Sequence, residues 1–176
     1  GGVVSGPLAD GVGLRLAARH EGSGEWQRSA TRPNDRNGKR NFTQMRALMD
    51  IAAGERLTVK LGATAFWDKS DVQGAQLIQV NPLLPPFVNP LLAAQPIVGR
   101  DARVGDWTAG TDPRRNDRQW HLTGRIDYEL TDAVTVTSLT SYADYKQDDL
   151  VDPDGTALVL ADTRDEGSIK AFFQEL

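Results

Sequence analysis

Polar and apolar residues alternate without interruption from residue 122 to residue 130, and this alternation restricts the fold more than any other feature of the sequence. One face of an extended chain carries apolar residues and a glycine, and the other carries polar residues: Leu122, Gly124, Ile126, Tyr128 and Leu130 against Thr123, Arg125, Asp127 and Glu129. A period of two residues is typical of a half-buried β-strand. No segment sustains the i, i+3, i+4, i+7 spacing of an amphipathic helix. The sequence therefore predicts an all-β fold.

The alternating strand recurs along the chain. The stretches 6–26, 49–71 and 128–148 each contain an apolar residue, a short turn with Asp, Gly or Thr, and a long alternating strand. Returning strands are expected at roughly residues 40–52 and 118–131. Together these segments predict an antiparallel meander of about seven long strands. Beyond Val136 the alternation weakens, so a β-bulge near that point is one interpretation, although the sequence does not fix its position.

The connections between the expected strands fall into two classes by length. Short turns alternate with long polar or proline-rich loops: turns at 9–11, 52–56 and 131–133, and loops at 27–39, 79–117 and 150–165. Short turns at one end and long loops at the other are the plan of an outer-membrane β-barrel. A soluble β-sandwich usually has shorter strands and more even loops. The loop pattern favours a transmembrane barrel.

Aromatic residues support the same interpretation. They recur at a similar distance from the short turns, in phase with the apolar face of their expected strands: Trp26, Trp67, Trp120 and Tyr142. Aromatic side chains at a common distance from the turns match the aromatic girdle that borders the apolar band of a barrel. Phe42 and Tyr145 fall out of phase. The general enrichment of aromatic residues in strands is the alternative explanation.

Composition and charge limit the possible functions. The chain has 176 residues, a formal net charge of −4 and no cysteine. The acidic balance gives no basic footprint for nucleic acid, and a disulfide framework or cysteine metal site is excluded. The two histidines, His20 and His121, lie on separate expected strands, and no metal-binding spacing or catalytic triad is present. We therefore expect no enzyme activity, no catalytic residue, no metal site and no cofactor.

Several stretches resemble TonB-dependent outer-membrane receptors. The likeness is carried by the segments GGVVSGPLADGVGLRLAARHE, RLTVKLGATAFWDKSDVQGAQL and DYELTDAVTVTSLTSYADYKQD. Within them, GPL before the first turn and TSLTSY in the ascending strand are the most specific pieces. The closing FFQEL resembles a recurring strand start that reads Ser-Gln-Glu-Leu, with Phe173 in place of Ser. The likeness covers nearly the whole chain and is weakest in the loop 79–117.

The resemblance implies a 22-stranded barrel with a plugged lumen in the outer membrane of a Gram-negative bacterium. Such receptors import a scarce ligand, such as an iron-siderophore complex or cobalamin, with energy from the TonB complex. Residues 1–176 are then expected to be an internal fragment of the barrel domain, without the plug domain or the TonB box. TonB would contact the missing N-terminal region. An open set of about seven strands cannot satisfy its edges in lipid, so we expect that the fragment alone does not transport a ligand.

A basic loop is the candidate ligand contact. Residues 28–40 carry five basic residues and one acid, Asp35. We predict that Arg32, Arg36 and Arg40 attract an anionic, siderophore-like ligand or the phosphates of lipopolysaccharide. Membrane lipid is the other expected partner, because it surrounds the barrel. The alternative is a solvated loop with a chance excess of charge. The segment 81–98, apolar but with five prolines, is expected either to fold over the barrel mouth or to line the ligand vestibule.

A second function class remains open. A non-transporting β-protein, either a soluble sandwich or a surface binding module, would also show alternating strands. In the receptor, the short turns would face the periplasm and the long loops the outside. The sequence that flanks these residues distinguishes the two classes, because the receptor requires a plug domain and a TonB box upstream and about fifteen further strands downstream.

Overall fold

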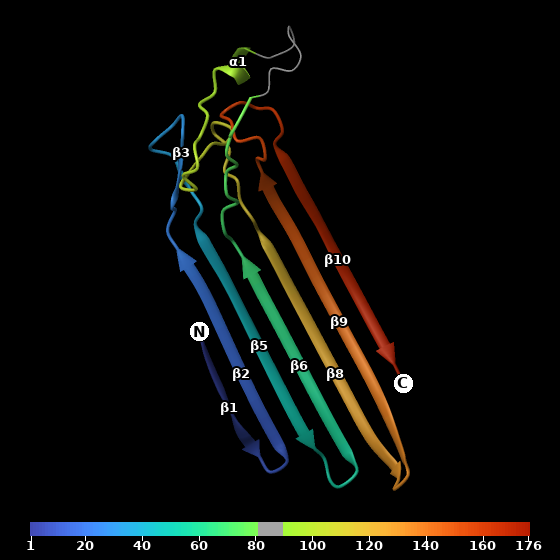
Figure 1. The fold of residues 1–176 in the computed structure, drawn as a ribbon. Coiled ribbons are helices and arrows are strands. Elements are labelled where there is room, and N and C mark those ends of the chain that lie inside the picture. The colour runs from blue at the N-terminus through green and yellow to red at the C-terminus, as the bar shows by residue number, and fades with distance from the viewer. Residues whose placement is uncertain (81–89) are drawn as a thin grey trace.

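The computed structural model describes residues 1–80 and 90–176, and nearly all of its regular structure is β (Figure 1). Seven strands form the main sheet: β1 (Gly2–Ala9), β2 (Val12–Ser23), β5 (Arg40–Ala52), β6 (Leu57–Asp68), β8 (Asp117–Thr131), β9 (Val134–Val151) and β10 (Thr163–Glu175). Three short strands form a second sheet: β3 (Gln27–Ser29), β4 (Arg36–Asn37) and β7 (Val104–Gly105). A single helical turn, α1, spans Pro90–Ala93. Across the described ranges, no helix has the length and hydrophobicity needed to span a membrane.

The main sheet is an antiparallel meander, so the expected fold is confirmed. Its strands lie in the order β1-β2-β5-β6-β8-β9-β10, and every neighbouring pair is antiparallel. The strands are long, with 18 residues in β9 and 15 in β8. Consecutive long strands are therefore neighbours in space, as the three repeated stretches predict.

Short and long connections lie at opposite ends of the main sheet (Figure 1). The short turns are residues 10–11, 53–56 and 132–133, and the long connections are residues 24–39, 69–116 and 152–162. Gly11 has a φ of 71°, in the left-handed region that residues with a side chain rarely adopt. The two-residue turn thus depends on the Asp-Gly pair. The expected alternation of connection lengths is confirmed.

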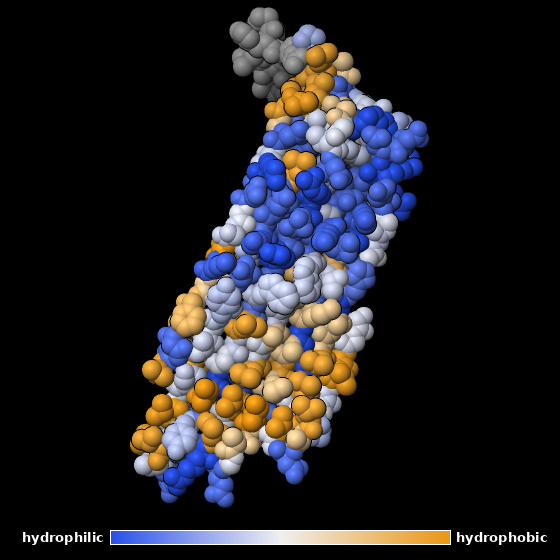
Figure 2. Space-filling view, turned by 180° about the vertical axis from the view of Figure 1, so that it is seen from behind, coloured by the Kyte–Doolittle hydropathy of each residue, from blue (hydrophilic) through white to orange (hydrophobic). Residues whose placement is uncertain are grey.

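One face of the main sheet is apolar over the half nearest the short turns. Residues that pair across the strands share a face, and one row contains Leu16, Ala47, Ala63, Leu122, Tyr142 and Phe172. Figure 2 shows apolar residues over the half of the sheet near the turns and hydrophilic residues over the other half. We call this the apolar face. Its side chains are open to their surroundings, with Leu122 50% and Phe172 70% exposed.

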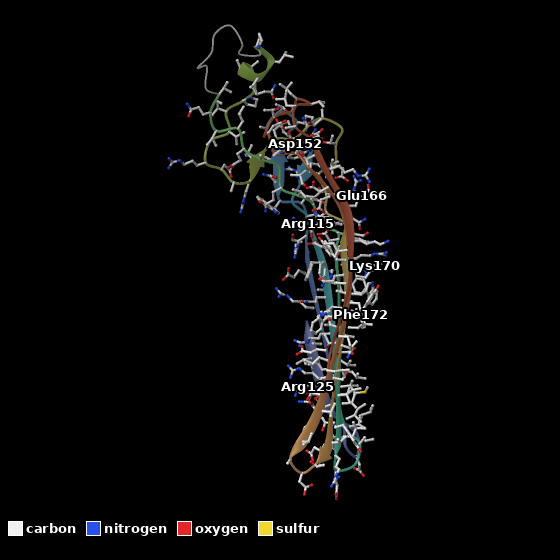
Figure 3. The ribbon with its side chains drawn as sticks, turned by 90° about the vertical axis from the view of Figure 1, so that its right-hand side faces the viewer. Arg115, Arg125, Asp152, Glu166, Lys170 and Phe172 are labelled. Atoms are coloured by element: carbon white, nitrogen blue, oxygen red, sulfur yellow. The ribbon has the colours of Figure 1, made fainter. Side chains whose placement is uncertain are left out.

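The opposite face of the main sheet is polar. One of its rows contains Asp50, Lys60 and Arg125, and another contains Arg46, Thr64 and His121. Figure 3 shows the sheet edge-on, with the long connections leaning over the face that carries Arg125. We call this the polar face. Phe42, Phe66 and Tyr145 lie on it, which explains why two of these aromatics are out of phase with the apolar face.

The main sheet has no hydrophobic core of its own. Among the described residues, the buried hydrophobic side chains are Ala65, Val98 and Trp107, and just one of these, Ala65, belongs to a strand of the main sheet. Buried polar residues outnumber them and gather in and beside the long connections, including Gln27, Ser29 and Asp106. The apolar face therefore lacks a second layer of protein within the described residues.

Two details differ from the expectations. Trp26 does not extend a strand, because β2 ends at Ser23, and its backbone N–H donates to the carbonyl of Asn37 within the first long connection.

The interpretation of a β-bulge beyond Val136 is wrong. The β8–β9 ladder runs unbroken from Tyr128↔Val136 to Arg118↔Lys146, and its irregularity lies near the turn, between Glu129 and Thr131. Ser138 and Thr140 simply replace apolar residues on the apolar face. Of the segment 81–98, residues 81–89 lie outside the described residues.

Candidate functional site

The three long connections are interlocked at one end of the sheet, and this loop assembly is the candidate functional region. Strand β3 of the first connection pairs with β7 of the second, in parallel, through Arg28↔Val104 and Ser29↔Gly105. The second connection also binds the third, since the backbone N–H of Thr108 donates to Asp152 Oδ2 at 2.6 Å. Segments far apart in sequence therefore form one structure.

Asp106 is the main acceptor of the loop assembly. Its carboxylate is 1% exposed and accepts hydrogen bonds from the hydroxyls of Ser29 and Thr31, both at 2.7 Å. It also accepts from the backbone N–H of Thr31 at 3.2 Å. Such charge-assisted hydrogen bonds compensate for the burial of a carboxylate. Asp106 thus fixes the first connection to the second.

Arg32, one of the predicted ligand contacts, takes part in the same structure. Its guanidinium lies 2.7 Å from Asp35 and 3.6 Å from Asp106, and it donates to the carbonyl of Trp107 at 2.6 Å. It also stacks 5.7 Å from the centre of the Trp107 ring. Arg32 is 23% exposed. These contacts show that the Arg32 side chain holds the loop assembly together.

Arg40 is also engaged, whereas Arg36 is not. Arg40 begins β5, forms ion pairs with Asp68 at 2.8 Å and Glu21 at 3.2 Å, and lies 4.7 Å above the Phe42 ring. Arg36 is exposed on β4, and its side chain has no hydrogen bond or ion pair with any residue in 1–80 or 90–176. The three arginines are thus in three different environments.

A network of charges lines the polar face where the main strands meet the loop assembly. Arg115 lies 3.5 Å from Asp149 and 3.8 Å from Asp68, which in turn binds Arg40. The side chains of Asp149 and Asp68 are 8% and 7% exposed. One buried oxygen of Asp149 and one of Asp117 have no hydrogen-bond partner among the residues that the structure describes. Arg115 therefore joins strands β6 and β9 to the second long connection.

Asp117 is a group of this network whose pKa is shifted. Burial raises the pKa of its carboxyl, and the negative charge of Asp149 raises it further, while Arg115 opposes the shift. The residue begins β8, three positions before Trp120, in the hydrophilic half of the sheet. A raised carboxyl pKa means that the fold favours the protonated form, so Asp117 favours the folded state more at acidic than at neutral pH.

The histidines do not form a metal site with each other. His20 Nδ1 lies 3.0 Å from the Thr43 hydroxyl on the apolar face, and His121 Nε2 lies 3.0 Å from the Ser141 hydroxyl on the polar face. Within the described ranges, no group of three or more His, Cys, Asp or Glu side chains is placed to hold a metal ion. The loop assembly thus offers hydrogen-bonding and ionic groups for binding.

Comparison with known proteins leaves the family open. No protein-family model, no curated protein and no solved structure matches the chain. The functional argument therefore depends on the two faces of the sheet and on the loop assembly.

Proposed function

We propose that the chain forms part of the wall of an outer-membrane β-barrel, in a TonB-dependent receptor that imports a scarce ligand such as an iron-siderophore complex or cobalamin. The observation that carries the proposal is the exposed apolar face of a sheet whose other face is polar. An exposed apolar patch that extends across several neighbouring strands marks an interaction surface. In a barrel wall, lipid covers the apolar face and the polar face borders the lumen.

The dimensions of the apolar face are compatible with this role. In strand β6, Trp67 lies ten positions after Leu57, which is next to the turn, and Trp67 contacts Trp120 edge to face with ring centres 5.3 Å apart. A tilted strand of ten or eleven residues covers about 25 Å, the height of a barrel's apolar band. The spanning segments therefore end at this pair of rings, and the loop assembly lies beyond them. We place the loop assembly outside the cell and the short turns in the periplasm.

Membrane contact is tested by spin labels at Val59 and Lys60 in the full-length protein. Neighbouring residues of a strand point to opposite faces, so Val59 should contact lipid and Lys60 should face the lumen. We expect a label at position 59 to be relaxed efficiently by oxygen, which concentrates in lipid, and a label at position 60 by a water-soluble relaxation agent. Equal accessibility at both positions would support the alternative, a soluble or surface β-sheet binding module.

Ligand attraction is proposed for the free cations of the first long connection. Arg28, Arg32 and Arg40 each form an ion pair. This leaves Arg36 and Lys39 as the cations of residues 28–40 whose side chains have no partner among the described residues and are able to act on a ligand in solution. Exposed charges of this kind increase the rate of association more than the final affinity. The proposal for the basic loop thus narrows from three arginines to Arg36 and Lys39.

The corresponding experiment measures association of an anionic ferric tricatecholate with the purified full-length receptor. The double variant Arg36→Gln/Lys39→Gln should associate about threefold to tenfold more slowly at low salt and at the parental rate at high salt. The control Arg56→Gln/Lys60→Gln removes the same charge near the short turns and should associate at the parental rate. Parental association of the first variant at low salt would refute the attraction.

A further inference from the structure

Three basic side chains gather on the side of the apolar face, directly beyond its apolar half. Lys69, Arg118 and Lys146 line a hollow of about 580 Å³, together with Trp67. The β-sheet register explains their proximity, because Arg118 pairs with Trp67 on one side and with Lys146 on the other. We call Lys69, Arg118 and Lys146 the outer basic cluster.

The outer basic cluster has no ion-pair partner within residues 1–80 and 90–176. None of its three side chains forms a hydrogen bond or ion pair with the part of the chain that the structure describes. Two acids also line the hollow, but Arg164 holds both, with Asp148 at 3.0 Å and Glu166 at 3.2 Å. Like charges directly opposite each other on neighbouring strands are destabilising. The Arg118–Lys146 pair therefore carries a repulsion that a bound anion would relieve.

The position of the outer basic cluster along the strands indicates which kind of anion would bind there. The next row towards the short turns contains Trp120 and the ion pair of Asp144 with Lys170, 3.8 Å apart. The row after that contains Leu122, Tyr142 and Phe172 and is apolar. Rows on one face are two residues apart, which is about 6.6 Å along a strand. The cations thus lie one or two rows beyond the apolar residues, past a level of aromatic rings.

We propose that the outer basic cluster binds the phosphate of an outer-leaflet lipid headgroup. The inference rests on the proposed function, because it requires lipid to cover the apolar face. With the acyl chains against Leu122 and Phe172, a headgroup phosphate lies at the level of Arg118 and Lys146. A guanidinium and two ammonium groups match a phosphate in charge and in hydrogen-bond donors. An imported ligand would instead meet the polar face and the loop assembly.

The experiment compares lipid binding by the full-length receptor and two triple variants. The test variant is Lys69→Gln/Arg118→Gln/Lys146→Gln, and the matched control, on the polar face, is Arg15→Gln/Arg46→Gln/Lys60→Gln. Both lose three positive charges. Native mass spectrometry measures binding of a diphosphorylated glucosamine-based lipid and of the same lipid without its phosphates. We expect the test variant to bind the phosphorylated lipid on the order of 100-fold more weakly, at about fivefold for each basic side chain. The control should bind like the parent.

The outcomes separate this inference from the proposed function. Flotation with lipid vesicles first reports whether the parent protein inserts into a membrane, and failure to float would overturn both proposals. If the parent floats and the test variant still binds the phosphorylated lipid at parental strength, the lipid site alone is refuted. Release of the lipid from the parent by excess inorganic phosphate would also refute it, since the cluster would then be a site for free phosphate. Equal binding of the dephosphorylated lipid by all three proteins would support it.

Discussion

Replacing Ile126 with arginine is expected to lower the free energy of unfolding by about 2–4 kcal/mol, the cost of a basic side chain facing lipid near the middle of a bilayer. Ile126 lies on the apolar face, six residues from both Trp120 and Asp132. The measurement is urea-induced unfolding of the full-length protein from lipid vesicles, followed by tryptophan fluorescence. The cost is large because lipid offers the new guanidinium charge neither water nor a counter-ion.

Thr123→Arg is the matched control, because it places the same side chain on the polar face, in the same strand. Thr123 is exposed and pairs with Gly62 and Ser141. We expect its effect to stay within about 0.5 kcal/mol, as for other exposed substitutions. Similar destabilisation by the two arginines would mean that neither face contacts lipid, and the barrel proposal would have to be abandoned.

Replacing Asp106 with alanine should release the first long connection from the second. The hydroxyls of Ser29 and Thr31 lose their acceptor, and Arg32 loses one of its two carboxylate partners. Leaving buried donors unsatisfied costs about 1–3 kcal/mol, with the upper end applying to charged groups. We expect hydrogen exchange in residues 24–39 to become faster by about 10- to 100-fold. Protease added to intact cells should cut the same residues faster.

Asp112→Ala provides the control for this experiment. Asp112 lies in the same connection, is exposed, and its side chain has no ion pair or hydrogen bond within the described ranges. It should leave both exchange and proteolysis unchanged. If Asp106→Ala behaves like the control, the hydrogen bonds of Asp106 do not hold the loops together. Cleavage that requires a permeabilised outer membrane would place the loop assembly in the periplasm.

The long strands could be predicted from sequence because the alternation that marks each of them involves residues of a single strand. Alternation between Leu122 and Leu130 depends on residues of one strand, and it places Arg125 and Ile126 on opposite faces without knowledge of their neighbours. The same rule, extended past Trp120, places Arg118 on the apolar face. Pairing of Arg118 with Lys146 requires the register, which depends on the geometry of the turn and its irregularity at Glu129.

The loop assembly could not be predicted because its contacts join distant positions. Arg32 pairs with Asp106, a residue 74 positions away, and β3 pairs in parallel with β7. These contacts have no periodic signal, and the short strands are of two or three residues. A count of charges in residues 28–40 therefore described a basic loop, although acids from other segments neutralise part of it. Trp26 was misplaced for the same reason, since Asn37 rather than a strand neighbour fixes it.

The polar interior of the loop assembly determines how it would open. Its joints are hydrogen bonds and ion pairs, and the second connection is bonded to both of the others, through Asp106 and through Thr108. No one of the three connections can therefore move away from the others without breaking these bonds. The three connections are expected to move together. Opening would expose more buried polar residues than apolar ones, and polar exposure lowers the heat capacity, which offsets the increase from Val98 and Trp107. The loop assembly would thus respond to temperature differently from the apolar face of the main sheet.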